Sequence, residues 1–352
     1  MRSPPSTSAP AHVDLLFTSA LPPHATLSPD TLARLRTLVA SHVSAPATSG
    51  SYLLQQSRDR KGKRPQRFST SLEDLDDHIG GGFDSGEIVE VTGPRRSGRT
   101  ALALYIVLLH LLLHDDKRAA LLDTTGSFDA FRCLAILRDV LVPKMYALGG
   151  SFAGEDGAEP SAEDLAISVL DRLAVSRVAK SGDALDVLAA EVRSDEKDEV
   201  LDMVVVDSLD TLVGGEALAS GSAQANANLI AFMRRLATLA RSKSAPLTVI
   251  TVTSLGTPAA KGSHTAPIPP NLPQQPPPLS SLPHPIPLKP ALGSTFAYLV
   301  DISLVVSPAE PLFGPDDGRD RGFVEVARNK RGETGGMVEF KLEKGVRFEQ
   351  VD

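Results

Sequence analysis

The sequence predicts an α/β fold whose mainly parallel central sheet is flanked by helices. Short apolar runs alternate along the chain with longer segments of helical pattern, which is the element order of a βαβ protein. The runs are apolar throughout rather than at every second residue, as is typical of strands covered on both faces. The predicted strands are 88–91, 119–123, 203–207 and 247–253.

The composition limits the class of protein. Of 352 residues, 42% are hydrophobic and 22% are charged, so a sizeable core can form and a wholly disordered chain is excluded. The net charge of −7 argues against a uniformly basic nucleic-acid binder, though not against a local basic patch. The single cysteine, Cys133, excludes a disulfide framework and a cysteine zinc site. The longest apolar run, 101–113, is too short for a membrane span, so we expect a soluble intracellular protein.

Residues 1–67 are predicted to be an N-terminal region outside the core. We expect the Pro-, Ser- and Ala-rich residues 1–29 to be mobile, and leucines at helical spacing predict one short helix over about 30–43. Residues 44–67 are predicted to be a linker. It ends in RDRKGKRPQR, with six basic residues and one acidic residue, which fits a solvated linker, a nuclear-import signal or a phosphate-binding patch.

The core is predicted to span residues 68–352. A Pro-rich insertion at 256–290, with 12 prolines in 35 positions, is not expected to form helix or sheet. Beyond it, three strand-like segments joined by turns predict an antiparallel extension. These segments are 296–306, 323–328 and 338–342, and the predicted helices are 101–113, 130–146, 162–179, 183–192 and 223–242.

The strand at 88–91 leads directly into a phosphate-binding loop motif, GPRRSGRT. Its spacing is G-x-x-x-x-G-K-[ST] with Arg99 in the lysine position. Glycines let backbone N–H groups converge on phosphate oxygens, and the following helix presents its positive end. Arginine keeps the positive charge but differs in shape and reach, so placement of a terminal phosphate is expected to change. The predicted binding residues are Gly93, Pro94, Arg95, Arg96, Ser97, Gly98, Arg99 and Thr100.

A second element of such a site is the apolar strand that ends in Asp207. In phosphate-binding-loop proteins, a carboxylate at this place and the loop hydroxyl, here Thr100, hold Mg²⁺. Asp207 also suits the cap of a following helix. The combination of loop and carboxylate favours a nucleotide with Mg²⁺.

Together these motifs resemble the RecA-type recombinases, most closely the eukaryotic recombinase paralogues. The resemblance implies a RecA-like P-loop ATPase core with C-terminal antiparallel strands that binds ATP and Mg²⁺, with Arg132 against the adenine. An exposed helix charge explains Arg132 equally well. The segment at 288–306 is most similar to the D-type paralogues. The segments that carry the resemblance are FSTSLEDLDDHIGGGFDSGEIVEVTGPRRSGRT, LLDTTGSFDAFR, VVVDSLDTL, TVITVTS, LKPALGSTFAYLVDISLVV and ARNKRGETGGMVEFKLEKGVRF.

Three positions depart from the family pattern. Thr125 replaces the glutamate that polarises the attacking water, and Thr253 or Ser254 replaces an Asn or Gln that senses the γ-phosphate. A threonine hydroxyl cannot act as the base, and losing a positioned base costs about 10²–10⁴-fold in rate. With Arg99 also altered, we assign no catalytic residue and expect weak or absent hydrolysis.

The resemblance implies two DNA-binding loops, but few basic residues lie in them. The first, 209–225, has no Lys or Arg, and the second, 256–290, has two lysines. Better candidates are Arg328, Lys330 and Arg331, although each also fits a solvated surface. Because non-specific binding needs several positive contacts, we expect weak binding to single-stranded DNA.

The resemblance implies a nuclear, ATP-binding accessory factor of homologous-recombination DNA repair. It would assemble with other recombinase paralogues or the recombinase itself, and would help the recombinase assemble on single-stranded DNA. One alternative is an active DNA-stimulated ATPase in which Glu87, Glu90 or Asp123 activates the water. Another is an interaction scaffold with a vestigial nucleotide site.

Overall fold

The computed structural model divides the chain into two compact units, residues 1–65 and 66–352. The division lies two residues from the boundary predicted at 67/68. In the first unit the structure describes residues 28, 30, 31, 33, 34, 37, 49–51 and 54. In the second it describes residues 66–152, 159–193, 200–220, 223–241, 246–256, 289–292, 296–310, 314 and 320–351.

The described residues of the first unit include parts of two helical stretches. Five residues between 30 and 37 are helical, in agreement with the predicted helix. The Ser28 hydroxyl accepts a hydrogen bond from the Thr31 N–H at 3.2 Å, as an N-cap does. Gly50, Ser51 and Leu54 are also helical, although they lie in the predicted linker. No proline lies between Pro46 and Pro65 to prevent a helix there.

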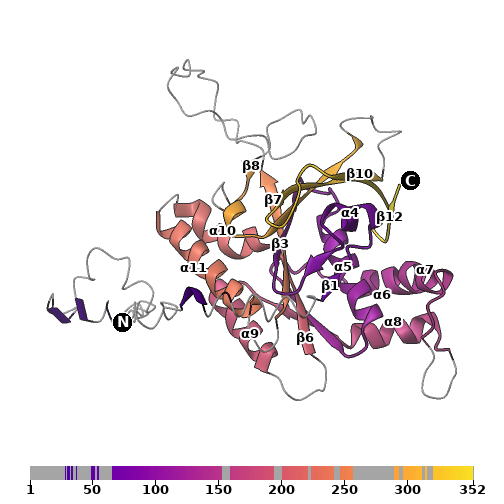
Figure 1. Cartoon of the computed structure of the whole chain (residues 1–352), viewed down its shortest axis with the longest axis horizontal. Coiled ribbons are helices and arrows are strands. Elements are labelled where there is room, and N and C mark those ends of the chain that lie inside the picture. Colours follow the sequence, from indigo (N-terminus) through magenta and orange to yellow (C-terminus); the bar gives the residue numbers. More distant parts are fainter. Residues whose placement is uncertain are drawn as a thin grey trace, which may run out of the picture. The chain divides into compact units, whose positions relative to one another are not determined.

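The second unit is built on one large mixed sheet with the strand order β12-β11-β10-β9-β3-β7-β6-β4-β5 and with β8 paired to β7 (Figure 1). Strands β9 to β5 in this order are parallel, and β10, β11 and β12 add antiparallel. The predicted fold class is therefore confirmed. The strands are β3 Ile88–Gly93, β4 Lys117–Asp123, β5 Leu173–Arg177, β6 Val200–Asp207, β7 Thr248–Gly256, β8 Lys289–Pro290, β9 Ile302–Pro308, β10 Arg321–Asn329, β11 Met337–Glu343 and β12 Arg347–Gln350. A separate pair joins β1 Arg67–Phe68 to β2 Phe83–Asp84.

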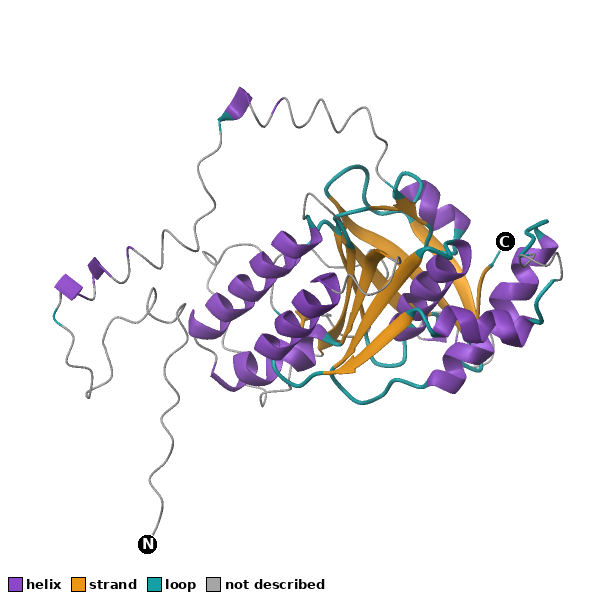
Figure 2. Ribbon diagram, turned by 90° about the horizontal axis from the view of Figure 1, so that it is seen from below, coloured by secondary structure: helices purple, strands orange, loops and turns teal. Residues whose placement is uncertain are grey.

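Helices cover both faces of the sheet (Figure 2). One face packs against α4 Glu73–His78, α5 Arg99–Leu113, α6 Ala130–Ile136, the π-helical η1 Leu137–Leu141, α7 Val142–Ala147 and α8 Ala162–Leu170. The other packs against α9 Ser181–Arg193, α10 Leu209–Ser220, α11 Ala223–Ala240 and the 3-10 turn η2 Phe296–Tyr298. Along β6, Met203 and Val205 join the first core, and Val204 and Val206 join the second. Burial on both sides explains why the predicted strands are apolar throughout.

Two predicted helices differ from the observed elements. The helix expected over 162–179 ends at Leu170, and its second half forms the edge strand β5. In β5 only Leu173 is buried, and the remaining residues are partly or largely exposed, with Val175 at 41%. Such an edge strand lacks the continuous apolar run that marks the inner strands. The helix expected over 130–146 is interrupted by the π-helical η1.

The segments predicted as DNA-binding loops also differ from expectation. Residues 209–220 of the first form α10, because Leu209, Leu212 and Val213 are buried in the second core. The ends of the Pro-rich insertion are strands, with Leu255 paired to Pro290 and Gly256 to Lys289. Its residues 257–288 lie outside the described part of the chain.

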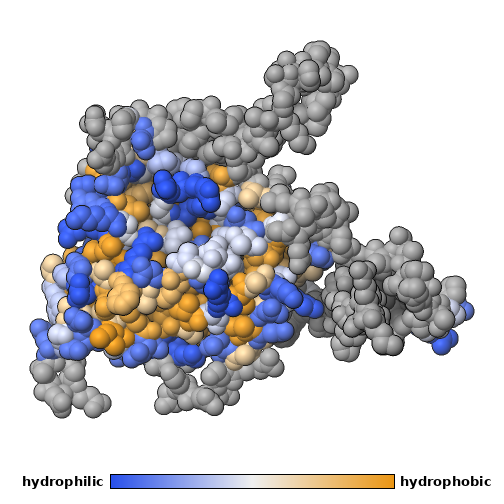
Figure 3. All heavy atoms as spheres, turned by 180° about the vertical axis from the view of Figure 1, so that it is seen from behind, coloured by the Kyte–Doolittle hydropathy of each residue, from blue (hydrophilic) through white to orange (hydrophobic). Residues whose placement is uncertain are grey.

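Some large apolar side chains remain exposed on the α6–α8 side of the second unit. Phe131 is 83% exposed, Leu148 is 72% exposed and Ile167 is 46% exposed. Seen from behind, this side carries apolar patches among polar ones (Figure 3). Among the described helices, none has the length and apolar character needed to cross a membrane.

Candidate nucleotide-binding site

The predicted phosphate-binding loop lies at the carboxyl edge of the parallel sheet. Gly93 at the end of β3 pairs with Ser254 of β7. Asp207 at the end of β6 pairs with Val252 of β7 and with Asp123 of β4. The topology therefore brings the loop and both aspartates to one edge, which is where α/β sheets bind ligands.

The loop backbone leaves little room for other residues. A Cβ on Gly93 would lie 2.1 Å from the Val306 carbonyl oxygen. Gly98, the N-cap of α5, has a φ of 96°, in the left-handed region that favours glycine. Arg96 is also left-handed, with a φ of 64°.

The loop has the features expected of an anion site. The first four N–H groups of α5 have no partner within the helix, and they lie at its positive end. The Ser97 hydroxyl is buried without a hydrogen-bond partner, and its residue is only 4% exposed. A phosphate oxygen would satisfy such a group. Arg95 and Arg96 are exposed beside it.

Thr100 and Asp207, the two residues predicted to hold Mg²⁺, lie near each other. The Thr100 hydroxyl is near enough to favour the charged form of the Asp207 carboxyl group, which is partly buried. Burial raises the pKa of Asp207, while the Thr100 hydroxyl and the Arg99 charge oppose that shift. No group of three or more His, Cys, Asp or Glu in the described ranges could hold a metal by itself. Two protein oxygens suit Mg²⁺ that is also bound by nucleotide phosphates and water.

Arg99 does not extend freely from the loop. Its Nη1 donates to the Thr253 carbonyl oxygen and to Ser254 Oγ at 2.9 Å, both at the end of β7. Burial lowers the pKa of Arg99, while the charges of Asp210 and Asp207 oppose that shift.

Asp210 is a site residue that the sequence analysis missed. It lies in the first turn of α10, three residues after Asp207. Its Oδ1 is buried without a hydrogen-bond partner, and its charge acts on Arg99, Asp207 and Glu90. Its only sequence signal is an acidic residue soon after the predicted metal carboxylate.

The exit of β4 is held by Asp123. Its carboxylate accepts hydrogen bonds from the backbone N–H groups of residues 125–128 at 2.7–3.3 Å. Burial raises the pKa of Asp123, but these four hydrogen bonds outweigh it and the net shift is downward. Thr125 lies in this loop, with its hydroxyl 2.6 Å from that of Ser127. Thr124 ties the loop to β6, donating to the Ser208 carbonyl oxygen at 2.9 Å.

The three carboxylates considered as substitute bases are engaged elsewhere. Asp123 holds the β4 loop. Glu90 is buried in the sheet, where it accepts from Thr253 and Ser303 at 2.7 Å each, and burial raises its pKa. Glu87 lies at the other end of β3 and pairs with Arg331 at 2.6 Å.

Arg132 lies at the turn between β11 and β12. Its Nε donates to the Gly345 carbonyl oxygen at 2.8 Å. Arg132 therefore ties the start of α6 to the C-terminal hairpin in this structure.

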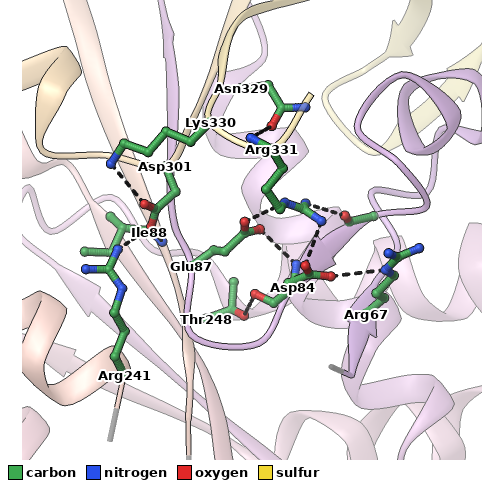
Figure 4. A network of polar contacts seen from close by, with 11 residues as sticks. Arg67, Asp84, Glu87, Ile88, Arg241, Thr248, Asp301, Asn329, Lys330 and Arg331 are labelled. Atoms are coloured by element: carbon green, nitrogen blue, oxygen red, sulfur yellow. Dashed lines mark hydrogen bonds and ion pairs between the residues drawn. The ribbon is translucent and has the colours of Figure 1, made fainter. Parts of the chain in front are cut away.

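The structure does not bring the predicted DNA residues to the loop. Arg331 binds Asp84 at 2.8 Å and Glu87 at 2.6 Å, and Lys330 binds Asp301 at 3.0 Å (Figure 4). These groups lie at the amino end of β3, roughly 17 Å of strand away from the loop. Arg331 therefore links the end of β10 to residues just before β3, and Lys330 links it to the residue just before β9. Arg241 also binds Asp301, at 2.7 Å.

Arg328 differs from its two neighbours. Its guanidinium lies over the ring of Tyr298, 4.8 Å from the ring centroid. Tyr298 is 71% exposed. Together they form a cationic and aromatic surface pair that no sequence pattern indicates.

No family model matches the chain. The crystal structure of the RadB recombinase superposes with a TM-score of 0.51 and 19% identity, covering 81% of this chain and all of that one. The second unit thus has the α/β fold of a RecA-like protein.

Sequence similarity points to the same group over part of the chain. The DNA repair and recombination protein RadB of Thermococcus kodakarensis is 42% identical over 65 residues, 18% of this chain and 27% of that protein. The RadB protein of Methanococcoides burtonii is 25% identical over 114 residues, 30% of this chain and 50% of that protein. The chain thus spans a quarter to a half of the relatives it matches, and is homologous to archaeal RadB in that segment.

Proposed function

We propose that this chain is a nucleotide-binding recombinase paralogue that acts as an accessory or mediator factor in homologous-recombination DNA repair. The single observation that carries the proposal is the loop at Gly93–Thr100, with its buried unpartnered Ser97 hydroxyl, beside the Thr100–Asp207 pair. The similarity to proteins named for DNA repair and recombination supports the biological role. The segment at 288–306 favours a eukaryotic D-type paralogue, and with the basic run at 58–67 it favours a nuclear protein.

In the proposed complex, backbone N–H groups of residues 95–100 bind the phosphates, since Pro94 has no N–H group. Thr100 and Asp207 hold Mg²⁺, which neutralises phosphate charge when bound. Arg132, on α6, is the proposed adenine contact. The chain supplies binding and orientation, while hydrolysis is weak or absent.

The proposed partners are other recombinase paralogues or the recombinase itself. Phe131, which is 83% exposed on α6 next to Arg132 in the sequence, is the proposed apolar contact with a partner. A nucleotide at a subunit boundary would stabilise the assembled form by mass action.

Calorimetric titration of the full chain with Mg²⁺-ATP tests the nucleotide site. We expect Thr100→Ala and Asp207→Asn each to weaken binding by about tenfold or more, because each removes an oxygen that holds Mg²⁺. Thr238→Ala removes a hydroxyl on the exposed side of α11 and should bind like the unmodified chain. If the unmodified chain binds no nucleotide, the scaffold with a vestigial site becomes the better description.

Single-stranded DNA is the second proposed ligand, and the Tyr298–Arg328 pair, whose tyrosine is 71% exposed, is a candidate contact for it. Stacking of a base on an aromatic ring contributes about 1–3 kcal/mol. We therefore expect Tyr298→Ala to weaken oligonucleotide binding about 5- to 150-fold in fluorescence anisotropy. Tyr298→Phe keeps the ring and should retain most of the affinity. Equal affinity of the Ala variant and the unmodified chain would exclude this pair as the contact.

A further inference from the structure

The arrangement around Arg99 bears on which nucleotide the site prefers. A loop lysine normally reaches the β- and γ-phosphates. Here the corresponding guanidinium is already bound at the end of β7, to the Thr253 carbonyl oxygen and to Ser254 Oγ. Because a guanidinium is a rigid planar fork, contacts on one side restrict where its other N–H groups point.

The surrounding charges also hold Arg99 where it is. Asp207 and Asp210 are close enough to favour its charged form. One oxygen of Asp210 is buried and has no hydrogen-bond partner. A γ-phosphate approaching Arg99 would meet this carboxylate, and two anions at short range repel each other strongly in a partly buried site.

The neighbouring side chains offer little compensation. Thr253 is buried, and its hydroxyl donates to Glu90. Thr125 is exposed, and its hydroxyl is paired with Ser127 and lies 3.3 Å from Asp123. The α- and β-phosphates, by contrast, need chiefly the loop N–H groups and the Ser97 hydroxyl.

We infer that this site binds nucleoside diphosphate and triphosphate with nearly equal affinity, because Arg99 is bound to β7 and Asp210 opposes the terminal phosphate. This inference rests on the proposed nucleotide-binding function. Asp210 and Arg99 would be its specificity-determining residues. The bound nucleotide would then act as a structural ligand, and its occupancy of the site would not depend on whether it carries a γ-phosphate.

The test is calorimetric titration of the full chain with ADP and with ATP, each with Mg²⁺. We expect the ratio of the two dissociation constants to lie within about threefold of one. Asp210→Asn removes the repelling charge, and Arg99→Lys replaces the fork with a group that reaches the phosphates. Each should shift the ratio toward ATP by about tenfold, the size of one charge-assisted hydrogen bond. Arg138→Lys, an exposed arginine paired with Asp139, should leave the ratio unchanged.

The outcomes separate this inference from the proposed function. ATP binding more than tenfold tighter than ADP binding to the unmodified chain would overturn the inference and leave the nucleotide site intact. No binding of either nucleotide would overturn both. An unchanged ratio in a folded Asp210→Asn variant would exclude Asp210 as a determinant, and thermal unfolding of each variant establishes that it is folded.

Discussion

Phe348→Ala is expected to lower the free energy of unfolding by about 3–5 kcal/mol, the range for removing a buried aromatic ring. Phe348 on β12 is 2% exposed. Its ring stacks on Phe340 with centroids 4.5 Å apart and lies 5.5 Å from the ring of Tyr105. Its N–H donates to the Tyr105 hydroxyl at 2.8 Å, which in turn donates to the Val346 carbonyl oxygen.

This contact matters because Tyr105 lies on α5, the helix that begins in the phosphate-binding loop. The last strand of the chain thereby fixes the position of that helix. Burial raises the pKa of Tyr105 to about 12, so the hydroxyl remains a donor over the working pH range. Urea unfolding followed by circular dichroism measures the change. Phe131→Ala removes an 83% exposed ring and should change stability by no more than about 0.5 kcal/mol. If Phe348→Ala also changed the free energy of unfolding by no more than about 0.5 kcal/mol, β12 would not anchor α5.

The inner part of the fold could be predicted from the sequence because its signals are local. Strands buried on both faces, such as β6, produce continuous apolar runs. The edge strand β5 buries only part of its residues, so its pattern does not distinguish it from the end of a helix. The helix α10 was missed because Gly214 and Gly215 favour a loop, whereas tertiary burial of Leu212 and Val213 stabilises a helix.

Only those site residues that a sequence motif marks could be predicted, and their partners in space could not. Loop spacing identifies Thr100, the end of an apolar strand identifies Asp207, and the topology brings both to one edge of the sheet. The partner of Arg99 includes a backbone carbonyl on another strand, which no side-chain pattern can show. Arg331 was predicted as a DNA residue because basic runs suggest phosphate contacts. Its partners Asp84 and Glu87 are distant in the sequence, so their pairing required the structure.

A carboxylate introduced at position 125 is expected to produce the largest change in activity. In the chain as it stands, we expect ATP turnover to be slow or absent with and without single-stranded DNA. The second residue after β4 at the site edge is Thr125, which cannot accept a proton at neutral pH. Asp123 next to it is held by four backbone N–H groups, and its lowered pKa makes it a weak base.

Thr125→Glu should supply the missing base, but a base accelerates the reaction only when the terminal phosphate is positioned. The comparison is therefore best made with Arg99→Lys already in place. In that background we expect Thr125→Glu to raise single-turnover ATP hydrolysis by about 10²-fold, the lower end for general-base catalysis. Thr125→Gln has nearly the same shape without a proton-accepting carboxylate, so it should leave the rate unchanged.

A different result would identify a different base. Suppose that the unmodified chain hydrolyses ATP readily, loses this activity in Asp207→Asn, and responds equally to Glu and Gln at position 125. The alternative function, an active DNA-stimulated ATPase, would then be the correct one. Among the carboxylates described near the loop, Asp210 would be the next candidate, because its Oδ1 has no hydrogen-bond partner, whereas Glu90 is bound by two hydroxyls. Loss of turnover in Asp210→Asn with retained nucleotide binding would identify Asp210 as the catalytic base. The same substitution would raise ATP affinity only if the Asp210 charge also repels the terminal phosphate.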